Sequence, residues 1–251
     1  MAYIRIDDVS VDFPLYHGSA RSLKKTVFAA ASGRLGEDKR RRVVVQALRN
    51  INIELNSGDR LGLVGTNGAG KTTLLRTIAG IYEPGQGRIR VDGSLNALLD
   101  PQLGMNVDLT GRENILLRGL YNGFTRPEIE AMEADVQAFA ELGEFLDLPV
   151  RFYSSGMVVR LGFALATCIR PEVLLMDEWF LAGDANFMAK ARVRLESVVR
   201  GAEILVLSSH QSGAVLDWCT RVAWMDHGRI LMDGPAKHVM ECYLAGAVPP
   251  A

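Results

Sequence analysis

The fold of this chain is decided by the stretch Gly65-Thr66-Asn67-Gly68-Ala69-Gly70-Lys71-Thr72, which matches G-x-x-x-x-G-K-[ST] at every fixed position. Apolar residues 61–64 predict a buried strand before it, and residues 73–79 predict the start of a helix after it. In this context the motif forms a phosphate-binding loop, because its glycines let backbone N–H groups wrap around phosphate oxygens. A chance glycine-rich turn is the alternative. We predict that this stretch, with Thr73, binds a nucleoside triphosphate, Lys71 reaching the β- and γ-phosphates and Thr72 holding Mg²⁺.

Two adjacent carboxylates end a second apolar run. Residues 173–178 read Val-Leu-Leu-Met-Asp-Glu, which predicts a buried strand ending in Asp177 and Glu178. Parallel strands bring their last residues to the carboxyl edge of a sheet, where the phosphate-binding loop also lies. Asp177 would then hold the Mg²⁺ shell, and Glu178 would polarise the attacking water. The alternative is an ordinary exposed turn, and the position of the pair after the loop counts against it.

Two further segments have a weaker signal when each is taken alone. Ser154, Ser155, Gly156 and Met157 precede a largely apolar run and predict an N-cap that opens a helix. A serine at such a cap most often has only this structural function. Residues 204–208 predict another strand, and His210 follows it. Because a lone histidine after a strand is more often a solvated loop residue than a catalytic one, both segments leave their function open.

The composition excludes several classes of protein. The 251 residues are 48% hydrophobic, which is typical of a globular chain with a sizeable core. A net charge of −1 gives no electrostatic reason to expect nucleic-acid binding. No apolar stretch approaches the ~20 residues that would span a bilayer, and the charged N-terminus does not predict a signal peptide. Cys168, Cys219 and Cys242 share no metal-ligand spacing and are expected to be reduced, mostly buried thiols in the cytoplasm.

Periodicity separates β-rich from helical parts of the chain. Alternating residues 3–13 predict an amphipathic strand, and residues 43–55 predict a second one, broken by a polar turn. Strands near 88–91 and 95–99 would close an N-terminal β layer around the nucleotide core. Helical periodicity follows from residue 111 to about 145, and the core resumes with strands at 173–178, 204–208 and 221–226. The pattern predicts an α/β fold.

Taken in order, these motifs resemble those of the ATP-binding-cassette (ABC) ATPases from about residue 3 to 244. The resemblance implies a P-loop NTPase core with an N-terminal antiparallel β layer and a helical subdomain at 111–170, within one nucleotide-binding domain, 1–251. It also implies that residues 154–157 form the signature that binds the nucleotide of a partner subunit, although they depart from the usual Leu-Ser-Gly-Gly-Gln at three places. Further roles follow from the family positions: Phe13 stacks on adenine, Asp184 lies in the D-loop, His210 senses the γ-phosphate, and Gln102, with Asp100 as the alternative, senses Mg²⁺ in the Q-loop.

Residues 14–46 form an insertion that a generic cassette lacks. Within it, residues 22–30 have helical spacing, with Leu23, Val27 and Ala30 on one side and basic residues such as Arg21 nearby. Residues 33–42 predict a polar, charged loop. From the residues alone, a solvated surface insertion and an amphipathic helix near lipid headgroups both remain open.

The insertion and several local phrases resemble the ATPase subunits of exporters for O-antigen, capsule and teichoic-acid polysaccharides. The phrases are residues 109–115, 153–157, and 177–179 with 183–184. Trp179 and residues 233–235 are most similar to O-antigen exporters of lipopolysaccharide. This resemblance implies that residues 19–31 are a gate-like helix at the membrane interface. Because the sequence ends at Ala251, the carbohydrate-binding domain of some such subunits is not expected here.

The same resemblance implies how the protein works. ATP with Mg²⁺ would be sandwiched between the two subunits of a head-to-tail homodimer at the cytoplasmic face of the inner membrane. This homodimer would be coupled to a membrane-spanning permease subunit, and the complex would move lipid-linked polysaccharide. No nucleic-acid partner is expected. An importer ATPase would usually keep Leu-Ser-Gly-Gly-Gln, and a small-molecule P-loop kinase would not need Ser155 or His210. A nucleotide-binding module without turnover would predict damage at Glu178 or His210, and both residues are intact.

Overall fold

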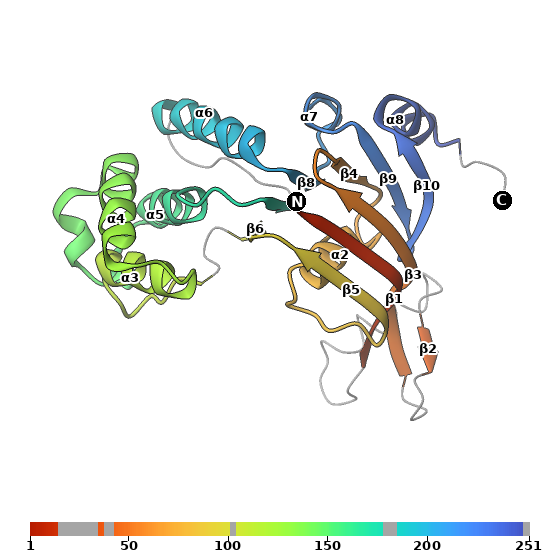
Figure 1. The fold of residues 1–251 in the computed structure, drawn as a ribbon, viewed down its shortest axis with the longest axis horizontal. Coiled ribbons are helices and arrows are strands. Elements are labelled where there is room, and N and C mark those ends of the chain that lie inside the picture. Colours follow the sequence, from red (N-terminus) through yellow and green to blue (C-terminus); the bar gives the residue numbers. More distant parts are fainter. Residues whose placement is uncertain (15–34, 38–42, 101–103, 178–184, 248–251) are drawn as a thin grey trace. The chain divides into compact units, whose positions relative to one another are not determined.

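The computed structural model describes residues 1–14, 35–37, 43–100, 104–177 and 185–247 (Figure 1). Contacts within the chain divide it into two units. The first consists of Met1–Ala97, Glu172–Glu178 and Glu203–Ala251, and the second of Leu98–Pro171 and Trp179–Ala202. The strands lie in the first unit apart from the last residue of one of them, and most of the helical length lies in the second.

An antiparallel sheet of four strands forms one layer of the first unit. Its strands lie in the order β2-β3-β1-β5; their bounds are β1 Tyr3–Pro14, β2 Leu35–Glu37, β3 Val43–Asn56 and β5 Gln86–Asp92. Alternate residues of β1 (Ile4, Ile6, Val9 and Val11) are buried, as the sequence pattern predicted. The antiparallel N-terminal layer is therefore confirmed.

Two details of this sheet differ from the prediction. The polar turn expected within 43–55 is a bulge inside one continuous strand, where Asn50 adopts a left-handed φ of 50° and the register with β1 shifts. An asparagine tolerates that conformation, so the strand bends without ending. Residues 35–37, expected within a loop, pair with β3 as the short strand β2. The predicted helix at 19–31 lies outside the described residues.

The second sheet forms the nucleotide core. Its six strands lie in the order β10-β9-β4-β8-β7-β6; their bounds are β4 Arg60–Val64, β6 Leu95–Leu98, β7 Val173–Asp177, β8 Ile204–Ser208, β9 Arg221–Asp226 and β10 Arg229–Pro235. The strands β4, β7, β8 and β9 run parallel and are nearly continuous apolar runs, since both faces of a parallel sheet are covered. The prediction that residues 95–99 belong to the N-terminal layer is wrong, because β6 joins the core sheet beside β7.

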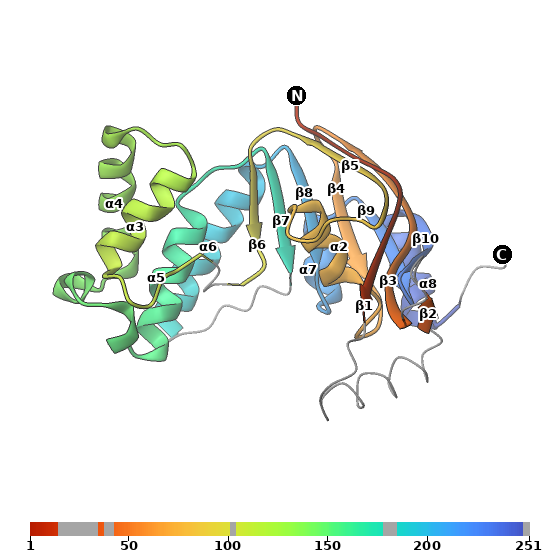
Figure 2. The same ribbon diagram turned by 90° about the horizontal axis from the view of Figure 1, so that it is seen from below.

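Among the described residues of the first unit, three helices accompany the sheets. The helix α2 (Lys71–Ile78) contacts strands of both sheets, as Figure 2 shows. The helices α7 (Ser212–Trp218) and α8 (Ala236–Ala245) contact each other, and α8 also packs on β9 and β10, where the rings of Trp224 and Tyr243 lie 5.4 Å apart. Because α2 follows β4 directly, it fixes where the phosphate-binding loop can lie.

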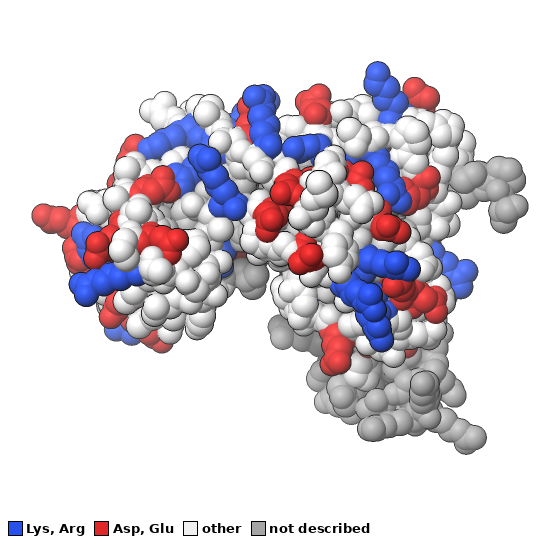
Figure 3. Space-filling model, viewed as in Figure 1, with Lys and Arg blue, Asp and Glu red and all other residues white. Residues whose placement is uncertain are grey.

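The second unit is helical. Its helices are α3 Gly111–Tyr121, α4 Arg126–Ala140, α5 Ser155–Thr167 and α6 Ala185–Gly201, with short 3₁₀ helices at Gly143–Asp147 and Val150–Phe152. Phe139, Phe163 and Phe187 join α4, α5 and α6 with ring centroids 5.4–5.8 Å apart. Among the described residues, none of the helices has the length and apolar character to cross a bilayer. Figure 3 shows both signs of charge interspersed over the visible face.

Candidate nucleotide site

The phosphate-binding loop connects β4 to α2 by a path that requires glycine. Gly65, Gly68 and Gly70 have φ of 148°, 82° and 111°, a region that side chains rarely adopt. The loop lines a cavity of about 330 Å³, formed by Asn67–Thr73 together with Ala47 of β3. Residues 67–73 of the predicted site therefore line one hollow, at the low end of the usual size of a ligand pocket.

The first turn of α2 is open to an anion. Among the described residues no side chain caps this helix, and its first turn contains no acidic residue, so its leading N–H groups and the positive end of the helix dipole can receive an anion. Lys71 is only 6% exposed. Its Nζ donates to the carbonyl oxygens of Gly65 at 2.8 Å and Thr66 at 3.3 Å. The loop therefore contains a buried ammonium group that is hydrogen-bonded to backbone oxygens. The loop is built to hold phosphate oxygens.

Three parallel strands bring the remaining core residues to the same sheet edge. Asp177 ends β7 opposite Ser208 of β8, and Ser208 also lies opposite Leu63 of β4, two residues before the loop. The Oδ1 of Asp177 and the Oγ of Ser208 are buried and accept or donate no hydrogen bond within the described residues. Buried polar atoms of this kind normally have a partner. Oxygen ligands suit Mg²⁺, so Asp177 and the Thr72 hydroxyl fit the predicted metal.

The other predicted residues have different outcomes. His210 follows β8 and is exposed. Phe13 of β1 lies opposite Val45 and packs edge-on against Tyr82 at 5.1 Å, and it is not among the residues that line the loop cavity. Glu178, Asp184 and Gln102 lie outside the described residues, so their roles stay predictions. Asp100 is described and exposed, which leaves the choice between it and Gln102 open.

The turn between β9 and β10, residues 226–228, is hydrogen-bonded to the phosphate-binding loop. The Gly228 N–H donates to the Ala69 carbonyl at 2.8 Å, and the Gly228 carbonyl accepts from the Arg49 N–H at 2.8 Å. His227 adopts a left-handed φ of 45°, and its Nδ1 lies 2.7 Å from Oδ2 of Asp226. Sequence reasoning missed this contact, because Asp-His-Gly indicates only a turn and its partners lie far away in the chain.

Replacing Gly228 by Ala should weaken nucleotide binding and lower the melting temperature. Gly228 has a φ of 77°, and an added Cβ would lie 2.5 Å from the Ala47 carbonyl oxygen, so the turn must shift and loosen its bond to the loop. We expect a loss of several degrees in melting temperature and a reduced affinity for ATP. Gly201→Ala is the matched control, because nothing lies within 4 Å of its added Cβ. Equal behaviour of the two variants would contradict this account.

In the second unit, the signature candidate forms the start of α5. The Ser154 Oγ accepts from the Met157 N–H at 3.3 Å, which confirms the predicted N-cap. Ser155 and Gly156 are exposed. Gly156 has no left-handed φ, and an added Cβ would find only the Ser154 hydroxyl, at 3.9 Å. Within the part of the chain that the structure describes, neither packing nor backbone geometry therefore requires a glycine at this position.

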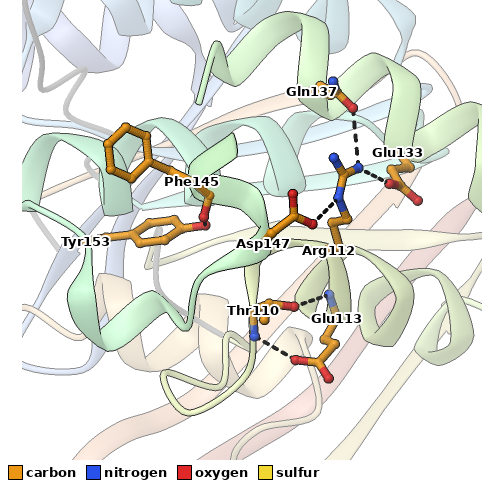
Figure 4. A network of polar contacts seen from close by, with 8 residues as sticks. All are labelled: Thr110, Arg112, Glu113, Glu133, Gln137, Phe145, Asp147 and Tyr153. Carbon is orange, nitrogen blue, oxygen red and sulfur yellow. Dashed lines mark hydrogen bonds and ion pairs between the residues drawn. The ribbon is translucent and has the colours of Figure 1, made fainter. Parts of the chain in front are cut away.

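Two of the sequence phrases that indicated the polysaccharide-exporter subfamily lie side by side in the second unit (Figure 4). Thr110 and Glu113 form a capping box at the start of α3, with N–H to side-chain distances of 3.1 and 2.7 Å. The Tyr153 hydroxyl donates to the Phe145 carbonyl at 2.6 Å and leaves no room for a side chain at Gly111. Residues 109–115 thus position the segment that leads into the signature.

Arg112 ties the same region together. Its guanidinium bonds Asp147 at 2.7 Å and Glu133 on α4, and Gln137 lies at 3.4 Å (Figure 4). The pKa of Arg112 is raised, first by the hydrogen bond to Asp147 and then by that to Glu133. This node joins α3, α4 and the 3₁₀ helix at 143–147, which explains why an arginine follows Gly111.

The capping box should make the helical unit sensitive to acid. Hydrogen bonds from the Thr110 backbone and side chain lower the pKa of Glu113 below its ordinary 4.5. A lowered folded pKa gives stability that is present above 4.5 and lost as the pH falls through the folded value. We expect Glu113→Gln, which keeps the cap but cannot titrate, to melt below the wild type at pH 7, with the difference vanishing at low pH. Melting curves from pH 7 to 3 test this, and a constant difference would contradict it.

Comparisons with known proteins agree on one family. Residues 48–181 match the ABC transporter family, a span that contains the phosphate-binding loop, the signature candidate and Asp177. The chain is 42% identical over 231 residues to the O-antigen export system ATP-binding protein RfbE of Yersinia enterocolitica, covering 92% of this chain and 97% of that protein. It is 34% identical to the teichoic acids export ATP-binding protein TagH of Lactococcus lactis, covering 85% of this chain and 46% of that protein.

A solved structure supports the same fold. The dimeric, post-hydrolysis structure of the ATP-binding cassette MJ0796 with ADP and phosphate superposes with a TM-score of 0.67 over 93% of this chain and 98% of that one. Its sequence identity is 17%, so the likeness bears on the fold. The predicted fold class, a P-loop core with an antiparallel N-terminal layer, is confirmed.

Proposed function

This chain belongs to the ABC transporter family and is an ABC ATPase, and we propose that it powers an exporter of lipid-linked polysaccharide. O-antigen is the polysaccharide that we propose first. The observation that carries the proposal is the 42% identity to an O-antigen export ATP-binding protein over nearly the full length of both chains. The open first turn of α2 and the buried Lys71 provide the nucleotide site that such a subunit needs.

A teichoic-acid or capsule exporter is the second candidate. It is favoured by the 34% identity to the TagH protein of Lactococcus lactis, although this chain spans about half of that protein. The higher identity favours O-antigen. Both candidates share the same chemistry at the nucleotide and differ in the polymer that the complex moves.

The active unit in this proposal is a head-to-tail homodimer with two ATP molecules between its subunits. Each nucleotide touches Lys71, Thr72 and Asp177 of one subunit and Ser155 and Gly156 of the other. Two features support it: both signature residues are exposed, and no contact among the described residues requires a glycine at 156. A bare glycine lets a phosphate oxygen approach the helix N-terminus closely. The MJ0796 cassette is itself dimeric.

Hydrolysis then depends on a few side chains of this chain. When bound, Mg²⁺ supplies charge neutralisation at the phosphates. Asp177 and Thr72 hold it, with Gln102 or Asp100 as the Q-loop contact. Glu178 orients the attacking water, His210 contacts the γ-phosphate, Asp184 lies at the dimer interface, and Phe13 stacks on adenine. Closure of the dimer excludes water and converts binding energy into motion.

The motion is passed to a separate membrane-spanning permease. The Yersinia enterocolitica relative is named as the ATP-binding protein of an export system, which supports such a division of labour. In this proposal the chain works at the cytoplasmic face of the inner membrane. We place residues 19–31 at the membrane interface beside that permease.

A deletion strain tests the proposal. Loss of this chain should remove the polysaccharide from the cell surface and leave lipid-linked polymer inside, and the wild-type gene should restore export while Glu178→Gln should not. The chemistry of the retained polymer distinguishes O-antigen from a teichoic or capsular polymer. Normal surface polysaccharide in the deletion strain would refute the proposed role.

A further inference from the structure

A second hollow lies on the first unit beside the turn that supports the phosphate-binding loop. Its volume is about 380 Å³, and it is lined by Arg49, Asn50, Asn52, Arg229, Ile230 and Asp233. None of these residues lines the loop cavity, which is formed by Ala47 and residues 67–73. The volume is sufficient for a small ligand.

The lining is biased toward positive charge. It contains two arginines and one carboxylate, and that carboxylate is already matched, because Arg221 Nε and Nη2 each bond Asp233 at 2.7 Å in a bidentate pair. The side chain of Arg229 is exposed and forms no ion pair or hydrogen bond within the part of the chain that the structure describes. Its guanidinium fork is therefore available to a ligand.

The asparagines of this hollow are held in place by the bulge between β1 and β3. The Asn50 amide donates to Asp8 Oδ1 at 2.6 Å, and Asn52 accepts from the Asp8 N–H at 2.9 Å and donates to the Asn50 carbonyl at 3.1 Å. Each amide nitrogen uses one of its two N–H groups in these bonds, so one donor of each remains. Amide donors held in place beside the Arg229 guanidinium are a donor set that suits an oxyanion.

We propose that this hollow, defined by Arg49, Arg229, Asn50 and Asn52, is a binding site for a phosphate group, separate from the nucleotide site. The Arg229 guanidinium presents two parallel N–H donors that match two oxygens of a phosphate, and the amides of Asn50 and Asn52 add further donors. The site adjoins the nucleotide loop through the backbone, since Arg49 bonds Gly228, which in turn bonds Ala69. A phosphate in this hollow would contact Arg49, whose backbone is bonded to the Gly228 turn next to the phosphate-binding loop.

The phosphate group can come from a small molecule in solution or from a lipid headgroup. The first experiment titrates inorganic phosphate and pyrophosphate into the full chain saturated with ADP, by calorimetry. We expect a binding event that Arg229→Gln weakens by about tenfold, the usual effect of losing one charge-assisted hydrogen bond. Arg88→Gln, an exposed arginine of β5 outside the hollow, is the matched control and should bind as the wild type does.

The second experiment measures flotation of the same variants with vesicles of phosphatidylglycerol and of phosphatidylcholine. If Arg229→Gln weakens the binding of phosphate in the titration, the ligand is a soluble phosphate. If Arg229→Gln weakens only the binding of the protein to phosphatidylglycerol vesicles, the ligand is a lipid headgroup. Phosphate that binds equally well to Arg229→Gln occupies the nucleotide loop instead and overturns the proposal. The absence of binding in both experiments overturns it too.

Discussion

The Lys71→Met variant should lose tight ATP binding, and its ATPase rate should fall by about 100-fold or more. The Lys71 ammonium lies inside the phosphate-binding loop, held by the Gly65 and Thr66 carbonyls, and Lys71 lines the cavity that the loop forms. Removing one such preorganised group typically costs two to three orders of magnitude in rate. Methionine keeps the length of the side chain, so the loss is one of charge. Nucleotide titration and steady-state phosphate release measure both effects.

The matched control for this variant is Lys237→Met on α8, an exposed lysine outside the loop cavity. It should bind and hydrolyse ATP as the wild type does. If Lys71→Met bound ATP with unchanged affinity and turned it over at the wild-type rate, the phosphate-binding role of this loop would be refuted.

The Glu178→Gln variant should bind ATP normally but hydrolyse it at least ~100-fold more slowly, and it should accumulate as an ATP-bound dimer. Glutamine keeps the size of the side chain and removes the carboxylate that polarises water, a contribution of about 10²–10⁴ in rate. Because the closed dimer reopens after hydrolysis, blocking the reaction traps it. Size-exclusion chromatography with light scattering, with and without ATP, measures the trapped species.

Glu241→Gln, an exposed glutamate on α8, is the control for the loss of a carboxylate and should remain fully active. A monomeric Glu178→Gln protein at saturating ATP would argue against the proposed dimer. Turnover near the wild-type rate would exclude Glu178 as the residue that activates water.

The phosphate-binding loop and the core strands could be predicted because their signals are local. Eight consecutive residues define the loop, and uninterrupted apolar runs define the buried parallel strands β7 and β8. The order of the strands then brings Asp177, His210 and the loop to one sheet edge, as the motif order suggested. At this site the residues that the motifs pointed out and the strand order of the sheet lead to the same place in the fold.

The features that were missed depend on contacts between distant residues. A strand was predicted near 95–99, but the local sequence does not say which sheet it joins, and the core sheet provides the partner. Ala47 resembles any small core residue, yet it lines the loop cavity because β3 passes beside the loop. The bond from Gly228 to Ala69 spans most of the chain. The polar turn expected within 43–55 is absent because Asn50 adopts a left-handed φ inside a bulge and the strand continues.

The measurement that tests the central claim most directly is the ATPase rate of this chain, alone and co-purified in lipid with the permease encoded beside its gene, with and without lipid-linked glycan. We predict that the complex hydrolyses ATP faster than the chain alone and that one class of glycan raises the rate further. Equal rates in both preparations, indifferent to every glycan tested, would leave an ABC ATPase and contradict its role in polysaccharide export.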